Sequence, residues 1–100
     1  MSIRRDAIER KSEMLSCAVV LAKEIGYTRV SKDNLAASVK CSPSLIMHYF
    51  STIKQLHRAI MGEAIRRNDL NLIAQGLINQ DPRIQHLPED LKREALDLFL

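Results

Sequence analysis

The sequence predicts an all-α chain, and three observations point to it. Glycine and proline occur only three times each, while leucine, isoleucine, alanine, arginine and glutamate are abundant, a composition typical of helical proteins. Apolar residues near the N-terminus recur at the spacing of one helix face. Ser31 and Ser42 stand where helices would begin, and Pro43 follows at a position where proline loses no hydrogen bond. The 100 residues predict one domain with a modest core.

The first predicted helix follows a short basic arm, residues 2–5, that contains Arg4 and Arg5. A stripe of apolar side chains at helical spacing marks this helix. The stripe consists of Ile8, Leu15, Ala18, Val19, Ala22 and Ile25. Gly26 is expected to end the helix, because glycine readily adopts the left-handed conformation.

Two short helices are predicted next. Ser31 can cap a helix that runs through Ser38, and Ser42 can cap a second helix that begins at Pro43, after a turn at Lys40 and Cys41. Apolar and small side chains can bury the contact between them. These are Leu35, Ala36, Val39, Cys41, Ile46 and Tyr49.

The spacing of these helices is that of a helix–turn–helix. Ala36 and Ile46 are ten residues apart with Lys40 midway, and the small side chain of Ala36 lets the second helix approach closely. Such a unit presents the start of its second helix to the major groove of DNA. The chain is therefore expected to bind double-stranded DNA.

The second half of the chain predicts two further helices. Thr52 with Gln55 resembles a capping box and opens a fourth helix that should continue to about Asn79. Asp81 and Pro82 interrupt the helical pattern. Residues 88–90, Pro-Glu-Asp, start a last short helix with acids at the positive end of its dipole.

These elements predict a three-helix head over residues 1–55 and a helical extension over residues 56–100, within one compact domain. The extension is expected to form a homodimer, because it holds more apolar residues than a small chain easily buries alone. The dimerisation candidates are Leu72, Ile73, Leu77, Leu91, Ala95, Leu98 and Phe99.

Charge is distributed unevenly along the chain. Residues 1–68 hold 12 Lys or Arg and 6 Asp or Glu, a balance of +6, whereas residues 69–100 hold 3 and 6, a balance of −3. A solvated surface is the plain interpretation of such a bias. Next to helix–turn–helix spacing, the basic part indicates an electrostatic footprint for phosphates, and the acidic part is expected to stay off DNA.

The order of these pieces resembles the DNA-binding domain of the tetracycline-repressor (TetR) family. The resemblance covers roughly residues 8–60 without a gap. The matching residues are Met14, Leu15, Ala18, Glu24, Ile25, Gly26, Tyr27, Val30, Ser31, Leu35, Ala36, Cys41, Ser42, Pro43, Ser44, Ile46, His48, Tyr49, Phe50, Thr52 and Leu56.

The resemblance implies a dimeric bacterial regulator in the cytoplasm, with a three-helix head whose third helix contacts bases in the major groove. Ser31 and Lys32 match phosphate-contacting places, and Ser42 caps the third helix. The positions that face DNA in the family correspond to Pro43, Ser44, Leu45, Met47, His48 and Tyr49.

Three residues depart from the family pattern. Lys40 stands where glycine is usual, so a left-handed backbone there would cost about 1 kcal/mol. Met47 replaces the usual tyrosine and Ile53 the usual lysine, which removes two expected phosphate contacts. The role of binding the DNA backbone is then expected to shift. The residues expected to take it over are Lys32, Lys40, Lys54, Arg4 and Arg5.

The chain is also much shorter than family members that carry a ligand-binding domain. About 40 residues follow the head, too few to enclose a pocket of several hundred cubic ångströms, so no small-molecule inducer is expected. This compactness resembles regulators of phages and plasmids. Control would then come from protein concentration or from a protein partner.

Several function classes lack support in the sequence. No glycine-rich phosphate loop, metal-spaced Cys/His set or carboxylate pair is evident, so no enzyme activity, cofactor or metal is expected. No apolar run approaches the roughly 20 residues that span a bilayer, and no signal peptide opens the sequence. Cys17 and Cys41 lie in apolar helical patterns and are expected to be reduced thiols, which favours the cytoplasm.

Individual side chains keep two interpretations each. Tyr49 can pack in the core or donate to a phosphate, and His48 can donate to a base or remain a plain surface residue. Ser44 and Leu45 can contact base edges or only fit the sugar–phosphate wall. The basic arm can enter the minor groove or be a disordered, solubilising end. His57 and His86 are expected to be ordinary surface residues, and the Arg66–Arg67 pair a solvated helix face.

The sequence thus predicts a sequence-specific DNA-binding repressor that binds a palindromic operator as a homodimer. The alternative is a protein–protein interaction module, such as an adaptor or anti-regulator, built on the same helical scaffold. The charge asymmetry favours DNA, and the missing tyrosine and lysine favour the alternative.

Overall fold

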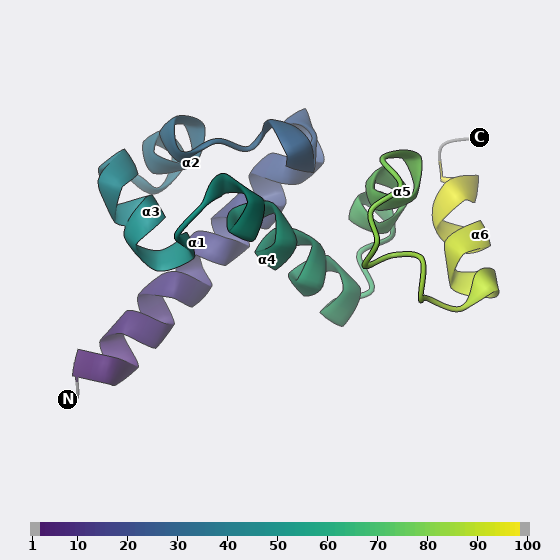
Figure 1. Cartoon of the computed structure of the whole chain (residues 1–100), viewed down its shortest axis with the longest axis horizontal. Coiled ribbons are helices and arrows are strands. Elements are labelled where there is room, and N and C mark those ends of the chain that lie inside the picture. The colour runs from purple at the N-terminus through teal and green to yellow at the C-terminus, as the bar shows by residue number, and fades with distance from the viewer. Residues whose placement is uncertain (1–2, 99–100) are drawn as a thin grey trace.

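The structure is a computed structural model that describes the backbone of residues 3–98 and the side chains of residues 6–98. Within these residues it contains only helices, as Figure 1 shows, and this confirms the all-α prediction. The elements are α1 (Ile3–Ile25), the 3-10 helix η1 (Tyr27–Arg29), α2 (Lys32–Val39), α3 (Pro43–Phe50), α4 (Ile53–Arg66), α5 (Leu70–Ile78) and α6 (Glu89–Asp97).

Helix α1 ends where the sequence predicts but begins earlier. Gly26 follows the helix with φ 99° and ψ 133°, a region that favours glycine, although it is not the left-handed helical conformation that was expected. Arg4 and Arg5 lie inside α1 rather than in an arm ahead of it. No helix-breaking residue stands between Ile3 and Asp6, and an acid in the first turn suits the helix dipole.

The caps of α2 and α3 form as predicted. The Ser31 hydroxyl oxygen accepts a hydrogen bond from the Asn34 N–H at 3.1 Å, and the Asn34 side-chain oxygen accepts from the Ser31 N–H at 2.8 Å. The Ser42 hydroxyl oxygen accepts from the Leu45 N–H at 3.2 Å. Between the two helices, Lys40 has φ 59° and ψ 52°, so the expected left-handed residue is confirmed.

The predicted fourth helix is in fact two helices. Thr52 caps α4 through the Gln55 N–H, as expected, but α4 ends at Arg66. Asn68 then adopts a positive φ of 52°, and the Asp69 carboxylate accepts the Leu72 N–H and caps α5. Asparagine tolerates this backbone and aspartate is a strong N-cap, so the pair interrupts an apolar pattern that otherwise continues.

The last helix begins at Glu89, as predicted, after a loop of residues 79–88. Ile84 of this loop is fully buried, so the loop packs back against the helices. A Cβ atom on Gly76 of α5 would lie only 2.5 Å from the Ile84 side chain. Glycine is therefore required at this contact between the loop and α5.

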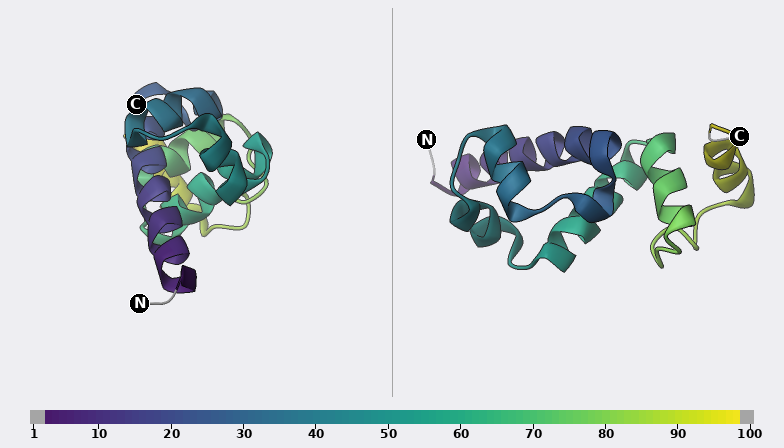
Figure 2. Two further views of the ribbon diagram at one scale, coloured as in Figure 1. Left: turned by 90° about the vertical axis from the view of Figure 1, so that its left-hand side faces the viewer. Right: turned by 90° about the horizontal axis from the view of Figure 1, so that it is seen from above.

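The helices form an elongated molecule with two ends, as the right-hand view of Figure 2 shows. Its principal extents are 43 × 26 × 18 Å. Helices α1 to α4 make one end, and α5 with α6 make the other (Figure 1). The expected division between residues 55 and 56 falls inside α4, whose Leu56, Ile60 and Ala64 are fully buried. Helix α4 is thus part of the core that supports α1 to α3.

No helix within residues 3–98 is both long enough and apolar enough to cross a membrane. Cys17 and Cys41 are half-buried free thiols.

Candidate nucleic-acid interface

Helix α3 presents one polar stripe to solvent. Ser44 and His48 are exposed, one helical turn apart, while Ile46 and Phe50 on the opposite face are buried. A hydroxyl and an imidazole can each donate or accept hydrogen bonds. The stripe therefore offers two side chains that can recognise base edges.

The other predicted DNA-facing side chains of α3 are partly used by the fold. Leu45, Met47 and Tyr49 are half-buried and pack against the core. The Tyr49 ring also lies edge-on to the His48 ring, with centroids 5.3 Å apart. Tyr49 therefore contributes to packing, and a phosphate contact from its hydroxyl group is left as a hypothesis.

The capping serines keep a hydrogen-bond donor besides the cap. The oxygens of Ser31 and Ser42 accept backbone hydrogen bonds, at the starts of α2 and α3 respectively. A hydroxyl group that accepts in this way still has its hydrogen to donate. Both serines can therefore donate to a phosphate without giving up their caps.

Three exposed lysines lie close to α3 in the sequence, two before it and one after it. Lys32 begins α2, Lys40 precedes α3, and Lys54 lies in the first turn of α4. Within residues 6–98, no carboxylate lies at ion-pair distance from any of them. They are therefore available to an anion.

Some cations away from α3 are paired with carboxylates. Arg66 and Arg67 both bind the Glu63 carboxylate, and Arg67 also donates to the Ser16 hydroxyl group. The hydrogen bond from Arg66 lowers the pKa of Glu63 below its ordinary value. The two arginines are exposed, as expected of a solvated helix face, and they also form an intramolecular ion-pair cluster with Glu63. Lys23 similarly pairs with Asp69 at 3.1 Å.

The dimerisation candidates divide into buried and exposed residues. Leu72, Ile73 and Ala95 are 0% exposed within a single chain, which corrects their assignment, because a second copy cannot contact them. They are buried because α5 packs on both α4 and α6. Leu77 and Leu91 are half-buried against the core.

Within the described part of the extension, the exposed apolar residues are the ones that remain available to a partner. Leu98 is 60% exposed and Ile78, which the sequence interpretation missed, is 63% exposed; Leu96 is 38% exposed. Phe99 lies outside the described residues, as do the side chains of Arg4 and Arg5.

His57 is a structural residue, contrary to the expectation of a plain surface histidine. Its Nε2 lies 2.7 Å from the Val30 carbonyl oxygen, and its ring meets the Tyr27 ring edge-on at 6.3 Å. Its partners are about thirty residues away in the sequence, which is why local patterns could not indicate them. His86 is exposed, as expected.

Tyr27 connects the two ends of the molecule. Its hydroxyl group donates to the Asp81 carboxylate at 3.0 Å, and its backbone N–H donates to the Gln75 side-chain oxygen at 2.8 Å. Burial, reinforced by the Asp81 carboxylate, raises the pKa of Tyr27 from 10.0 to about 12. The Gln75 amide also donates to the Ala22 carbonyl oxygen, so α5 is tied to α1.

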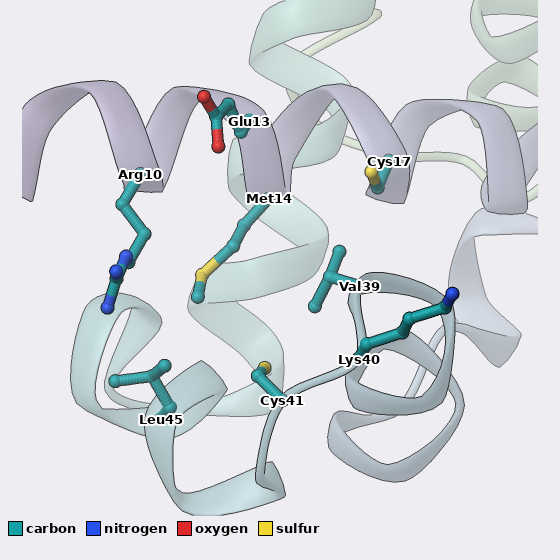
Figure 3. A pocket seen from close by; sticks show the side chains of 8 residues that line it. All are labelled: Arg10, Glu13, Met14, Cys17, Val39, Lys40, Cys41 and Leu45. Atoms are coloured by element: carbon teal, nitrogen blue, oxygen red, sulfur yellow. The ribbon is translucent and has the colours of Figure 1, made fainter.

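A groove of about 410 Å³ lies between α1 and the turn that joins α2 to α3, as Figure 3 shows. Met14 lines it from α1, Cys41 and Leu45 line it from the opposite side, and Arg10 extends from α1 along one side. The expectation of no inducer considered only the size of the extension, whereas this groove lies in the head. Within residues 6–98, no group of three or more His, Cys, Asp or Glu side chains could hold a metal ion.

Comparisons with known proteins add no relative. No protein-family model, no curated protein and no solved structure matches the chain.

Proposed function

We propose that α1 to α4 form a helix–turn–helix head that binds double-stranded DNA sequence-specifically, with α3 in the major groove. The observation that carries this proposal is the exposed stripe of Ser44 and His48, flanked by lysines that no carboxylate of residues 6–98 neutralises. A major groove about 12 Å wide admits a helix.

The arrangement of the elements supports the proposal. Helix α2 packs on α3 across a turn of three residues, Lys40 to Ser42. Helix α3 lies at the end of the molecule remote from α5 and α6 (Figure 1), so the acidic α6 does not cover it. A regular and accessible α3 is what entry into a groove requires.

In this proposal the side chains divide their roles. Ser44 and His48 contact base edges, while Ser31, Lys32, Lys40 and Lys54 hold backbone phosphates, which position the protein but specify no sequence. Leu45 and Met47 contribute mainly by fixing α3 on the core. In this proposal, no small molecule acts as an inducer.

A homodimer is part of the same proposal. One short helix contacts few base pairs, so a second head on a symmetric half-site is the usual remedy. The exposed apolar residues of α5 and α6 are the surfaces that can pair, namely Ile78, Leu96 and Leu98. A dimer on a palindromic operator would act as a repressor by occluding polymerase.

One observation favours the alternative of a protein–protein interaction module. Ile78 and Leu98 expose well over half of their apolar surface, which also suits a different protein partner. The salt dependence of binding separates the two functions. Contacts with phosphates release counterions from DNA, and this release gains less free energy as the salt concentration rises, so DNA binding weakens steeply with salt.

Selection of bound sequences from a random DNA pool tests the proposal directly. We expect a palindromic sequence, and we expect Ser44→Ala combined with His48→Ala to lose about 1–3 kcal/mol of discrimination for each base contact removed. His86→Ala, an exposed histidine outside the head, is the control and should keep the preference. A pool without enriched sequences would refute the proposed function.

A further inference from the structure

Two shallow grooves adjoin on the flank of the head, and both are lined by Arg58 and Arg83. The first has a volume of about 360 Å³ and adds Lys11. The second has a volume of about 370 Å³ and adds Lys54 and His57. We call them the cationic grooves. Arg83 belongs to the half of the sequence that was expected to stay off DNA, yet the fold returns it to the head.

Positive charge in the cationic grooves is almost uncompensated. Asp81 is the single carboxylate among the described residues that line the grooves, and it already accepts hydrogen bonds from the Tyr27 hydroxyl group and from the backbone N–H of Arg83. Within residues 6–98, no carboxylate lies at ion-pair distance from Lys11, Arg58 or Arg83. Like charges gathered in this way favour an anionic ligand.

The fold holds Arg83 in place beside Arg58. A Cβ atom on Gly62 of α4 would lie 3.0 Å from Nη1 of Arg83, so the guanidinium packs on α4 where the helix lacks a side chain. The next residue, Ile84, is fully buried and anchors the loop. The Asp81 carboxylate fixes the backbone of Arg83 at 2.9 Å.

The cationic grooves begin where α3 ends. Tyr49, Phe50 and Ser51, the end of α3 and its C-cap, line the first groove together with Lys11, whose Nζ lies 5.4 Å from the centroid of the Phe50 ring. The grooves therefore continue the surface of the proposed DNA-contacting helix rather than forming a separate site.

We propose that the cationic grooves bind backbone phosphates of the same DNA duplex that α3 contacts, with Arg58 and Arg83 as a pair of phosphate ligands. This inference rests on the proposed function. The cations are spread over two adjoining open grooves instead of converging on one point, which suits an extended polyanion. Guanidinium groups bind phosphate oxygens in bidentate fashion.

The test compares the wild-type chain with the double variant Arg58→Gln, Arg83→Gln on a selected DNA sequence and on a mismatched one. Each phosphate contact adds about 0.9 to the log–log slope of affinity against salt, so the double variant should lose about 1.8 of that slope. Its preference for the selected sequence should not change, because phosphate contacts carry no sequence information. Hydroxyl-radical footprinting should show DNA backbone positions that lose protection.

Two controls accompany the variant. Arg93→Gln removes one exposed charge from α6, at the other end of the molecule, and should leave the slope unchanged. Arg58→Lys with Arg83→Lys keeps the charge and should keep most of the slope. Thermal unfolding by circular dichroism verifies that every variant is folded.

The outcomes distinguish this inference from the proposed function. If the wild-type chain binds the selected DNA and the Arg58, Arg83 double variant retains its slope and footprint, the cationic grooves do not contact phosphates and the inference is overturned. If the wild-type chain shows no salt-dependent binding to any DNA, the proposed function fails and the inference fails with it.

Discussion

Lys40 adopts a backbone conformation that lowers the stability of the fold. Its left-handed backbone, with φ 59° and ψ 52°, is strained for a lysine and unstrained for glycine. The side chain is exposed and has no ion-pair partner within residues 6–98. A lysine that costs stability and has no carboxylate partner among residues 6–98 is consistent with the proposed role at a DNA phosphate.

Lys40→Gly is therefore expected to stabilise the chain and weaken DNA binding. Relief of the strain should raise the free energy of unfolding by about 1 kcal/mol, which corresponds to about 4–8 °C in Tm for a domain of this size. Thermal unfolding measures the first effect and the salt slope the second. Ala37→Gly, in the exposed interior of α2, is the control and should lower Tm; an unchanged or lower Tm for Lys40→Gly would contradict the strain.

Tyr27 predicts a specific alkaline loss of stability. Its pKa is about 12 in the folded chain against an ordinary 10.0, so folding favours the protonated phenol. The stabilisation is complete below about pH 10 and is lost as the pH rises through about 12.

Tyr27→Phe should abolish this component of the pH dependence. The variant should lose about 1.5 kcal/mol at neutral pH through the missing hydrogen bond to Asp81, and its stability should fall less steeply above pH 10. Urea unfolding between pH 8 and pH 12 measures both effects. Tyr49→Phe is the matched control and should keep the wild-type alkaline loss; the same steep loss in Tyr27→Phe would show that Tyr27 does not titrate in this way.

At the scale of elements, the local signals were the ones that sequence reasoning could use. Ser31, Ser42 and Thr52 act on N–H groups three residues away, so their caps are readable in a window of a few residues. The break between α4 and α5 differs from the predicted single helix, although Asn68 and Asp69 are a local signal for it. The apolar periodicity continues on either side of this pair and by itself predicts an uninterrupted helix.

Asp69 is expected to determine where α5 begins. Its carboxylate accepts the Leu72 N–H and pairs with Lys23 of α1. Asp69→Ala should therefore lower the free energy of unfolding by about 1–2 kcal/mol, as urea denaturation would measure. Asp33→Ala, an exposed acid in the first turn of α2, should cost less; equal effects would argue against a capping role for Asp69.

At the scale of the whole molecule, the extension is both part of the core and the proposed dimer surface. Ile84 and Ala95 are fully buried, so deletion of residues 84–100 would destabilise the core as well as remove a dimer contact. Point substitutions at exposed positions test dimerisation without this ambiguity.

Ile78→Gln with Leu98→Gln is expected to convert a dimer to a monomer. Both side chains are about 60% exposed, so the folded monomer should retain its stability while operator affinity falls. Sedimentation equilibrium measures the mass. Ile8→Gln with Val20→Gln, two comparably exposed apolar residues of α1, is the control and should remain dimeric; a dimer that survives the Ile78, Leu98 substitution would place the interface elsewhere.

The sequence by itself determined the helical class, the caps at Ser31 and Ser42 and the turn at Lys40, because each depends on residues within one or two helical turns. Only the tertiary structure decided which apolar residues are buried, so Leu72 and Ile73 became core and Ile78 became surface. It also brought His57 to Val30 and Arg83 to Arg58. Such neighbours are set by how helices pack on one another, and packing brings together residues whose separation along the chain carries no local signal.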